Sequence, residues 1–302
     1  MMIKEILKQW NIDDCPGQIC DSVWSVKETL ILKEYKDQKK LEKVIQLLKI
    51  LHEAGIPVPE IWPLPDGKEF YEKNNNRYLM MTRLKGEKVV NMNQLDESWF
   101  FNFGEILAKL HIAFRECEKS MVFRYLSLTD EMKGWVTREL DQFTPETLTK
   151  YDMKEAVHQL AQVDERLPKQ LIHRDVHLGN FLFEGKKFSG YIDFDLSQCN
   201  IRIFDVCYFL LGIRMDIENN QGNDRQWFLI VHRVMEGYNS LIKLKQIERQ
   251  SVACVMKNIE LLFMAYFLSI GDQKSAIKSA DSFLFVRENE KKILEAVSNF
   301  SD

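Results

Sequence analysis

The chain has 302 residues, of which 45% are hydrophobic and 28% are charged, and its formal net charge is −4. This size and composition are typical of a soluble globular protein with one large domain or two lobes. The acidic balance argues against a general nucleic-acid partner or an anionic-membrane partner, because both kinds of binding need a basic surface.

The N-terminal segment and the cysteines favour a cytoplasmic protein. Residues 1–10 alternate charged and apolar side chains, so they lack the continuous apolar stretch of a signal peptide. The longest mainly apolar run, residues 261–270, is about half of the roughly 20 residues that a membrane-spanning helix needs. The 6 cysteines show no CxxC spacing, which favours reduced thiols over a zinc site or disulfides. The oligomeric state stays open.

The first part of the chain predicts an antiparallel sheet followed by one helix. Short apolar segments at residues 19–20, 23–26 and 29–33 are separated by polar pairs that suit tight turns. Residues 37–54 carry an apolar stripe at helical spacing, and Gly55 stands where such a helix is expected to end.

Further strands are expected after this helix. Asp66-Gly67 predicts a hairpin between strands at residues 61–64 and 69–71. A turn at Asn74-Asn75-Asn76 leads into a third strand, residues 77–82, which runs toward Gly86.

The rest of the chain is mainly helical in pattern. Apolar residues recur at helical spacing over residues 99–114, 132–140, 154–167, 224–243, 246–268 and 276–300. His111 lies on one such stripe, where a hydrogen-bonded core histidine is more common than a catalytic one. Asp205 opens another apolar helix and could accept hydrogen bonds from backbone N–H groups there.

A polar loop between two apolar segments holds the densest chemistry in the chain. The run His173-Arg174-Asp175-Val176-His177-Leu178-Gly179-Asn180 lies between Leu171-Ile172 and Phe181-Leu182-Phe183. The apolar flanks predict short buried strands that present a polar loop, and a returning strand at residues 188–194 would bring Asp193 to the same end.

These residues suit phosphoryl transfer. That reaction needs a carboxylate near the attacking hydroxyl, oxygen ligands for Mg²⁺ and positive charge on the phosphates. Asp175 is the candidate that orients the hydroxyl, and Asn180 and Asp193 offer the amide and carboxylate oxygens that a hard cation prefers. His177 lies in the same loop and could contact a phosphate.

The order HxDxxxxN followed by Ile192-Asp193-Phe194 resembles the kinase-fold small-molecule phosphotransferases, which include aminoglycoside phosphotransferases and choline, homoserine and methylthioribose kinases. The resemblance implies an α+β, bilobal protein-kinase-like fold. Residues 1–85 would form a small nucleotide-binding lobe, an antiparallel sheet with one helix. Residues 86–302 would form a larger, mainly helical catalytic and substrate-binding lobe.

The resemblance also implies roles for residues of the first lobe. Lys33 stands where the family places the lysine that reaches the nucleotide phosphates, and Glu42 is the candidate for the glutamate that pairs with it. Ser22 lies where the phosphate-covering loop is expected, although the glycine pair is absent there. The backbone from Met81 to Leu84 would contact the nucleotide base.

The predicted function is Mg²⁺-dependent transfer of the γ-phosphate of ATP or GTP to a hydroxyl of a small molecule, an antibiotic or a metabolite. A protein kinase is disfavoured, because the segment between Asp193 and Asp205 is too short for an activation loop. The alternative is a non-catalytic kinase-fold protein that binds nucleotide as a scaffold. A metal-dependent hydrolase built on His173, Asp175 and His177 is excluded, because alternate residues of a tight loop do not face one metal ion.

Overall fold

The computed structural model describes residues 2–89, 95–123, 125–142, 148–219 and 223–298, and these residues form two compact units. The first unit combines the residues up to 89 with residues 179–195, and the second unit contains the remainder. By its contacts, the segment that carries Asn180 and Asp193 therefore belongs to the same unit as the N-terminal sheet. The division of roles between a nucleotide-binding lobe and a catalytic lobe stays a prediction.

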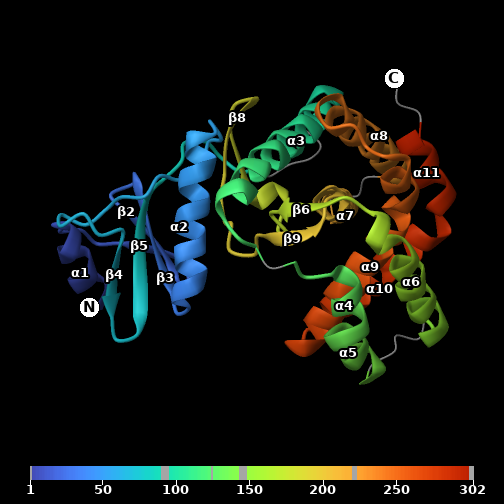
Figure 1. Ribbon diagram of the computed structural model, residues 1–302, viewed down its shortest axis with the longest axis horizontal. Coiled ribbons are helices and arrows are strands. Elements are labelled where there is room, and N and C mark those ends of the chain that lie inside the picture. Colours follow the sequence, from blue (N-terminus) through green and yellow to red (C-terminus); the bar gives the residue numbers. More distant parts are fainter. Residues whose placement is uncertain (1, 90–94, 124, 143–147, 220–222, 299–302) are drawn as a thin grey trace. The chain divides into compact units, whose positions relative to one another are not determined.

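A five-stranded antiparallel sheet is the centre of the first unit (Figure 1). Its strands are β1 (Gly17–Cys20), β2 (Val23–Val26), β3 (Leu30–Tyr35), β4 (Phe70–Lys73) and β5 (Asn76–Thr82), in the order β1-β2-β3-β5-β4. Leu30 and Leu32 of β3 are buried in the core, where Leu32 packs with Val26 and Met80. Because side chains alternate along a strand, Ile31 and Lys33 lie on the opposite face.

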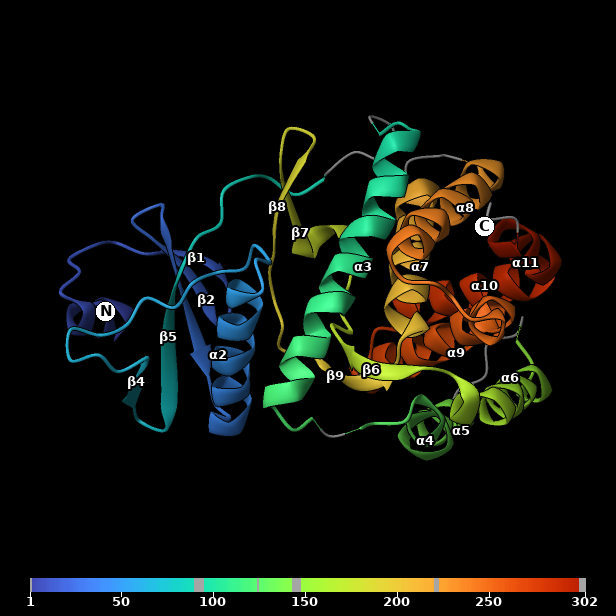
Figure 2. The ribbon, with the colours of Figure 1, turned by 45° about the horizontal axis from the view of Figure 1, so that its top comes forward.

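Helices flank this sheet. The short helix α1 (Met2–Leu7) and the 3₁₀ turn η1 (Lys8–Trp10) contribute Ile6, Leu7 and Trp10 to the core. Helix α2 (Gln38–Glu53) begins after Asp37, whose side chain accepts a hydrogen bond from the Lys40 amide. Figure 2 shows α2 lying along the sheet. Together, sheet and helix confirm the architecture predicted for the N-terminal part.

One predicted hairpin is wrong. Residues 61–64 form no strand, and Ile61 makes only an isolated bridge to Met81. The hairpin lies further on, where Asn74 and Asn75 adopt positive φ values of 52° and 65° between β4 and β5. Asparagine tolerates this left-handed conformation, so these residues make the predicted turn into β5. Asp66-Gly67 does lie in a turn, in which the Gly67 amide donates to the Leu64 carbonyl oxygen at 2.9 Å, but no strand immediately precedes that turn.

The remainder of the first unit is a second hairpin, β7 (Phe181–Glu184) and β8 (Lys187–Tyr191). It is joined to the N-terminal residues by backbone hydrogen bonds: Glu87 and Phe183 exchange both of theirs at 2.9 Å. Gly86 makes this approach possible. Its φ is +101°, and a Cβ there would lie 2.8 Å from the carbonyl group of Phe183.

The second unit is mainly helical, as predicted. Its helices are α3 (Glu97–Ser120), α4 (Leu128–Glu131), the π-helical turn η3 (Met132–Val136), α5 (Thr137–Gln142), α6 (Lys150–Val163), the 3₁₀ turn η4 (Asp164–Arg166), α7 (Ile203–Asn219), α8 (Asp224–Leu241), α9 (Gln246–Ser269), α10 (Gln273–Glu288) and α11 (Glu290–Ser298). Helix α9 is long and apolar enough to cross a membrane, but 78% of its apolar window is buried, which identifies a core helix.

Helices α3 and α8 lie side by side in this unit (Figures 1 and 2). Gly104 of α3 and Gly237 of α8 mark their closest approach, since a Cβ on Gly104 would lie 2.0 Å from the Val234 carbonyl oxygen. A two-stranded sheet, β6 (Lys169–Ile172) with β9 (Gln198–Ile201), precedes α7. The chain passes from the second unit into the first at the 3₁₀ turn η5 (Leu178–Asn180).

Candidate functional site

A pocket of about 510 Å³ lies within the first unit. That volume is within the range of pockets that bind small molecules and cofactors. Its lining comes from the β1–β2 hairpin, from β3 and α2, from the end of β5 and from residues 180–195, and includes Ile19, Cys20, Val23, Ile31, Lys33, Val44, Leu48, Met81, Leu84, Asn180, Leu182, Asp193 and Asp195. The apolar part of this lining is suited to binding a flat ring system, and the charged part is suited to binding phosphate groups and a metal ion.

Lys33 is the centre of the charged part. Its Nζ lies 3.0 Å from Asp193 Oδ1 and 2.8 Å from Asp195 Oδ1. Asp195 also pairs with Lys40 Nζ at 3.1 Å and accepts a hydrogen bond from the Tyr35 hydroxyl at 3.1 Å. Lysines and carboxylates thus compensate one another along one wall of the pocket.

The pKa values in this cluster follow from the pairing. Burial acts to raise the pKa of Asp195, but the charges of Lys33 and Lys40 outweigh it and hold that pKa below its usual range. Burial acts to lower the pKa of Lys33, and the carboxylates of Asp193 and Asp195 reverse this effect, so its pKa is raised. Lys33 and Asp195 are therefore both charged at neutral pH.

Oxygen donors suited to a divalent cation line the same pocket. Asn180 is buried, with 6% of its surface exposed, and its backbone carbonyl oxygen accepts a hydrogen bond from the Ile192 amide at 3.1 Å. That bond holds it near the turn that carries Asp193, whose φ is +65°. The described residues contain no group of three His, Cys, Asp or Glu side chains that could hold a metal ion. Mg²⁺ on a nucleotide needs only one or two carboxylates beside the phosphates, so Asn180 and Asp193 fit it.

The remaining residues predicted for nucleotide binding fall into two groups. Met81 and Leu84 line the pocket at the end of β5, whereas Ser22 lies in the turn between Cys20 and Val23, which do line it. Glu42 is placed elsewhere. It is exposed on α2 and accepts a hydrogen bond from Gln38 at 2.8 Å, while Lys33 takes its partners from the segment after β8.

In the second unit, the Asp175 side chain is held in a defined orientation. Its Oδ1 accepts a hydrogen bond from the Tyr208 hydroxyl at 2.8 Å, and its Oδ2 lies 3.8 Å from His177 Nε2. The Asp175 amide donates to His173 Nδ1 at 3.3 Å. About one quarter of the Asp175 side chain is exposed.

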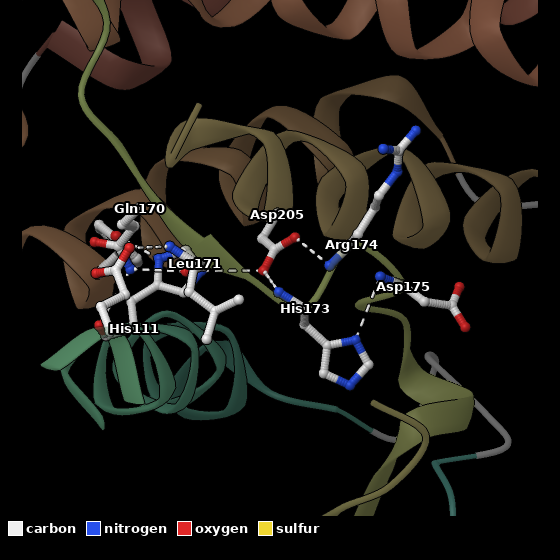
Figure 3. A network of polar contacts seen from close by, with 9 residues as sticks. His111, Gln170, Leu171, His173, Arg174, Asp175 and Asp205 are labelled. Carbon is white, nitrogen blue, oxygen red and sulfur yellow. Dashed lines mark hydrogen bonds and ion pairs between the residues drawn. The ribbon is translucent and has the colours of Figure 1, made fainter. Parts of the chain in front are cut away.

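The backbone of this loop is fixed by Asp205 of α7 (Figure 3). The Asp205 carboxylate accepts the amides of His173 at 2.8 Å and Arg174 at 2.9 Å, together with His111 Nε2 at 3.0 Å. His111 Nδ1 lies 2.8 Å from the Tyr238 hydroxyl. Since a carboxylate oxygen accepts, His111 Nε2 is the donor in its contact with Asp205. His111 is therefore a hydrogen-bonded core residue, as expected, and Asp205 braces the loop.

Arg174 has an unusual conformation for its residue type. Its φ is +69°, in the left-handed region that favours glycine. Its guanidinium group makes a charge-assisted contact with Glu131, at 2.8 and 2.9 Å to the two carboxylate oxygens. The Asp205 carboxylate and Glu131 together supply the contacts that offset this strain.

The structure groups the predicted site residues in two sets. Lys33, Met81, Leu84, Asn180 and Asp193 line one pocket in the first unit, and Asp175 and His177 lie together in the second. The sequence interpretation missed Asp195 and Tyr208. Asp195 stands two positions after Asp193, so the spacing of the two acids was the pattern that could have indicated it. Tyr208 is one aromatic residue of an apolar helix, and no pattern distinguishes it.

Comparison with known proteins identifies the class. Residues 17–238 match the model of the phosphotransferase enzyme family (APH), so the chain belongs to that family, as the resemblance predicted.

Individual proteins are similar to this chain in sequence or in structure. A homoserine kinase of Pseudomonas aeruginosa is 30% identical over 189 residues, which are 60% of this chain and 56% of the relative, so the match spans little more than half of that protein. Among solved structures, an amicoumacin kinase in complex with AMP-PNP, Ca²⁺ and Ami has a TM-score of 0.68 at 14% identity, over 95% of this chain and 90% of the other. A choline/ethanolamine kinase family protein from Mesorhizobium loti has a TM-score of 0.65 at 16% identity, over 98% and 99%. These likenesses confirm the predicted fold.

Proposed function

We propose that the protein is a kinase that transfers the γ-phosphate of ATP or GTP to a hydroxyl group of a small molecule. The observation that carries the proposal is the first-unit pocket, in which a lysine, two aspartates and a buried asparagine meet an apolar cleft. Family membership and the ordered Asp175 loop support it.

The nucleotide would occupy this pocket. Lys33 would bind the phosphates and Ser22 would cover them, and Glu42 and His177 are further candidates for contact with the nucleotide. Leu84 is suited to recognising the base: the amides of Thr82 and Arg83 donate to Glu60 and Thr29, whereas the Leu84 amide donates to no other described residue. That amide and the carbonyl groups from Met81 onward are the backbone groups that we assign to the base edge.

Asn180 and Asp193 would hold Mg²⁺. When bound, the ion would neutralise charge on the phosphates. Lys33 already bridges Asp193 and Asp195, so the pocket's own lysine keeps these carboxylates close together before any cation arrives.

Asp175 would orient the acceptor. The acceptor oxygen forms a bond to the γ-phosphorus, and the bond from that phosphorus to the bridging oxygen breaks, with its electron pair leaving on ADP or GDP. The hydroxyl proton passes to the Asp175 carboxylate. Only five positions separate Asp175 from Asn180 in the sequence, so one short segment carries both the acceptor group and a metal ligand.

The acceptor belongs to the class of small hydroxyl compounds. The relatives and structural neighbours act, by name, on homoserine, amicoumacin, aminoglycosides, choline or ethanolamine, and aminopropanol. A screen of L-homoserine, choline, aminopropanol, kanamycin, a macrolide and methylthioribose for ADP or GDP release would identify the acceptor. Homoserine comes first, because the sequence relatives are homoserine kinases.

The test of this function is the Asp175→Ala variant. We expect phosphoryl transfer to fall about 100-fold or more, because the group that accepts the hydroxyl proton is lost. Stabilisation of the protein by MgATP in a thermal melt should stay the same, because the nucleotide pocket lies in the other unit.

The control is Asp281→Ala, an exposed aspartate of α10, which should keep full activity. Transfer at the wild-type rate by Asp175→Ala would refute the mechanism. Nucleotide binding by the wild type without turnover of any acceptor would instead support the non-catalytic scaffold.

A further inference from the structure

Helix α7 holds the catalytic loop at two points that lie on one of its faces. Asp205, in its first turn, binds the backbone amides of His173 and Arg174. Tyr208, three residues later, binds the side chain of Asp175. Residues three apart on a helix are neighbours on its surface, so one rigid element fixes both the backbone and the carboxylate of the loop.

The Tyr208 ring is itself held firmly. It stacks on Phe204 with ring centroids 6.0 Å apart and packs against Phe263 of α9 at 5.3 Å. Burial and the neighbouring Asp175 carboxylate raise the pKa of Tyr208, so the phenol keeps its proton and donates it to Oδ1. The donor is therefore rigid, and it is protonated throughout the physiological pH range.

We infer that Tyr208 is a positioning residue for Asp175: it occupies Oδ1 and turns the plane of the carboxylate so that Oδ2 is presented to the acceptor hydroxyl. This inference rests on the proposed function of Asp175. A carboxylate has two equivalent oxygens and rotates readily about χ2, so an unrestrained Asp175 would meet the hydroxyl in a range of orientations. Fixing one oxygen selects the other, which lies on the side of His177.

Tyr208→Phe is the sharpest probe, since it removes only the hydroxyl group and keeps the ring packing. We expect kcat for ADP formation to fall roughly tenfold, the range of a mispositioned reacting group. This should hold in two assays, one with MgATP and L-homoserine and one with MgATP alone, in which water is the acceptor. The KM for MgATP should stay within twofold, because the nucleotide pocket is untouched. Tyr266→Phe, at a half-exposed tyrosine of α9, is the matched control and should behave as the wild type.

A double-mutant cycle separates positioning from general loosening. If Tyr208 acts through Asp175, then Tyr208→Phe should change the residual rate of Asp175→Asn by less than twofold, measured at high enzyme concentration. Equal losses in both backgrounds, or a wild-type kcat for Tyr208→Phe, would overturn the inference while leaving the proposed function intact. A fully active Asp175→Ala would overturn both, and so would a wild type that forms no ADP with any of the acceptors or with water.

Discussion

The Lys33 cluster of the first unit and the Asp205 network of the second hold their charges in opposite ways. Around Lys33, cations and carboxylates pair at the edge of a pocket, where Asp193 is about 45% exposed and Lys33 and Asp195 are 14% and 18% exposed. Around Asp205, a fully buried carboxylate is satisfied by two loop amides and a histidine. The charged groups around Lys33 can therefore bind a ligand in place of their present partners. The hydrogen bonds to Asp205 are internal to the protein and are not replaced by a ligand.

The difference predicts different costs for removing one partner. Exposed ion pairs contribute little net stability, because water replaces the lost partner. Buried groups left unpaired carry their full desolvation penalty. Variants of the buried network should therefore lower the free energy of unfolding. Variants of the exposed members of the Lys33 cluster, Asp193 and Lys40, should mainly change ligand binding.

The largest effect is expected for Asp205→Ala. It leaves the His173 and Arg174 amides and His111 Nε2 without their acceptor inside the protein. We expect the free energy of unfolding to fall by about 4 kcal/mol, as for other broken buried networks, with activity lost as well. Urea unfolding against the exposed Asp281→Ala control measures it, and a loss below about 1 kcal/mol would contradict the contrast between the two regions.

A smaller, pH-dependent effect is expected for Glu260→Gln in α9. Burial raises the pKa of Glu260 to about 7, against the opposing effects of the Ser282 hydroxyl and Arg214. The folded state thus binds a proton that the unfolded state releases near 4.5, so wild-type stability falls as the pH rises from about 4.5 to 7. The fall should be on the order of 3 kcal/mol.

The variant should lose this pH dependence, because an amide does not titrate. Urea unfolding at pH 5 and pH 8 would compare it with the wild type and with the exposed Glu288→Gln. The result also bears on the contrast between the two regions. Glu260 accepts a hydrogen bond from the Ser282 hydroxyl, whereas Asp205 accepts from three N–H groups, so the charged form of Glu260 is stabilised less by its neighbours. If the free energy of unfolding changed equally with pH in all three proteins, this prediction would be wrong.

The smallest effect is expected for Lys40→Met. Lys40 is about 39% exposed and shares Asp195 with the more buried Lys33. Its removal should cost less than about 1 kcal/mol of stability and weaken MgATP binding only a few-fold. Lys33→Met should weaken it tenfold or more, because it removes the proposed phosphate ligand. Calorimetric titration of both variants tests this, and an equal loss in the two would show that Asp195 depends on both lysines alike.

Much of the site was predictable because its residues are close in sequence. The loop from His173 to Asn180 lies between strands that its apolar flanks indicate, and the face of Lys33 follows from the alternation along β3. Partners distant in sequence were not predictable. Asp195 meets Lys33 across 162 positions and Tyr208 meets Asp175 across 33, and only the fold specifies such contacts. The hairpin near residue 66 failed because the proline-containing segment before its turn forms no strand, and β4 pairs with β5 instead.

The path of the backbone has a practical consequence for dividing the protein. The chain passes between the two units after residues 89, 178 and 195, so neither unit is a continuous stretch. A fragment ending at residue 89 would lack the β7–β8 hairpin that pairs with Glu87, together with Asn180, Asp193 and Asp195. Exchange of the first unit with that of a relative would therefore require two segments to be replaced, the N-terminal segment and the inserted hairpin, with three junctions in the chain.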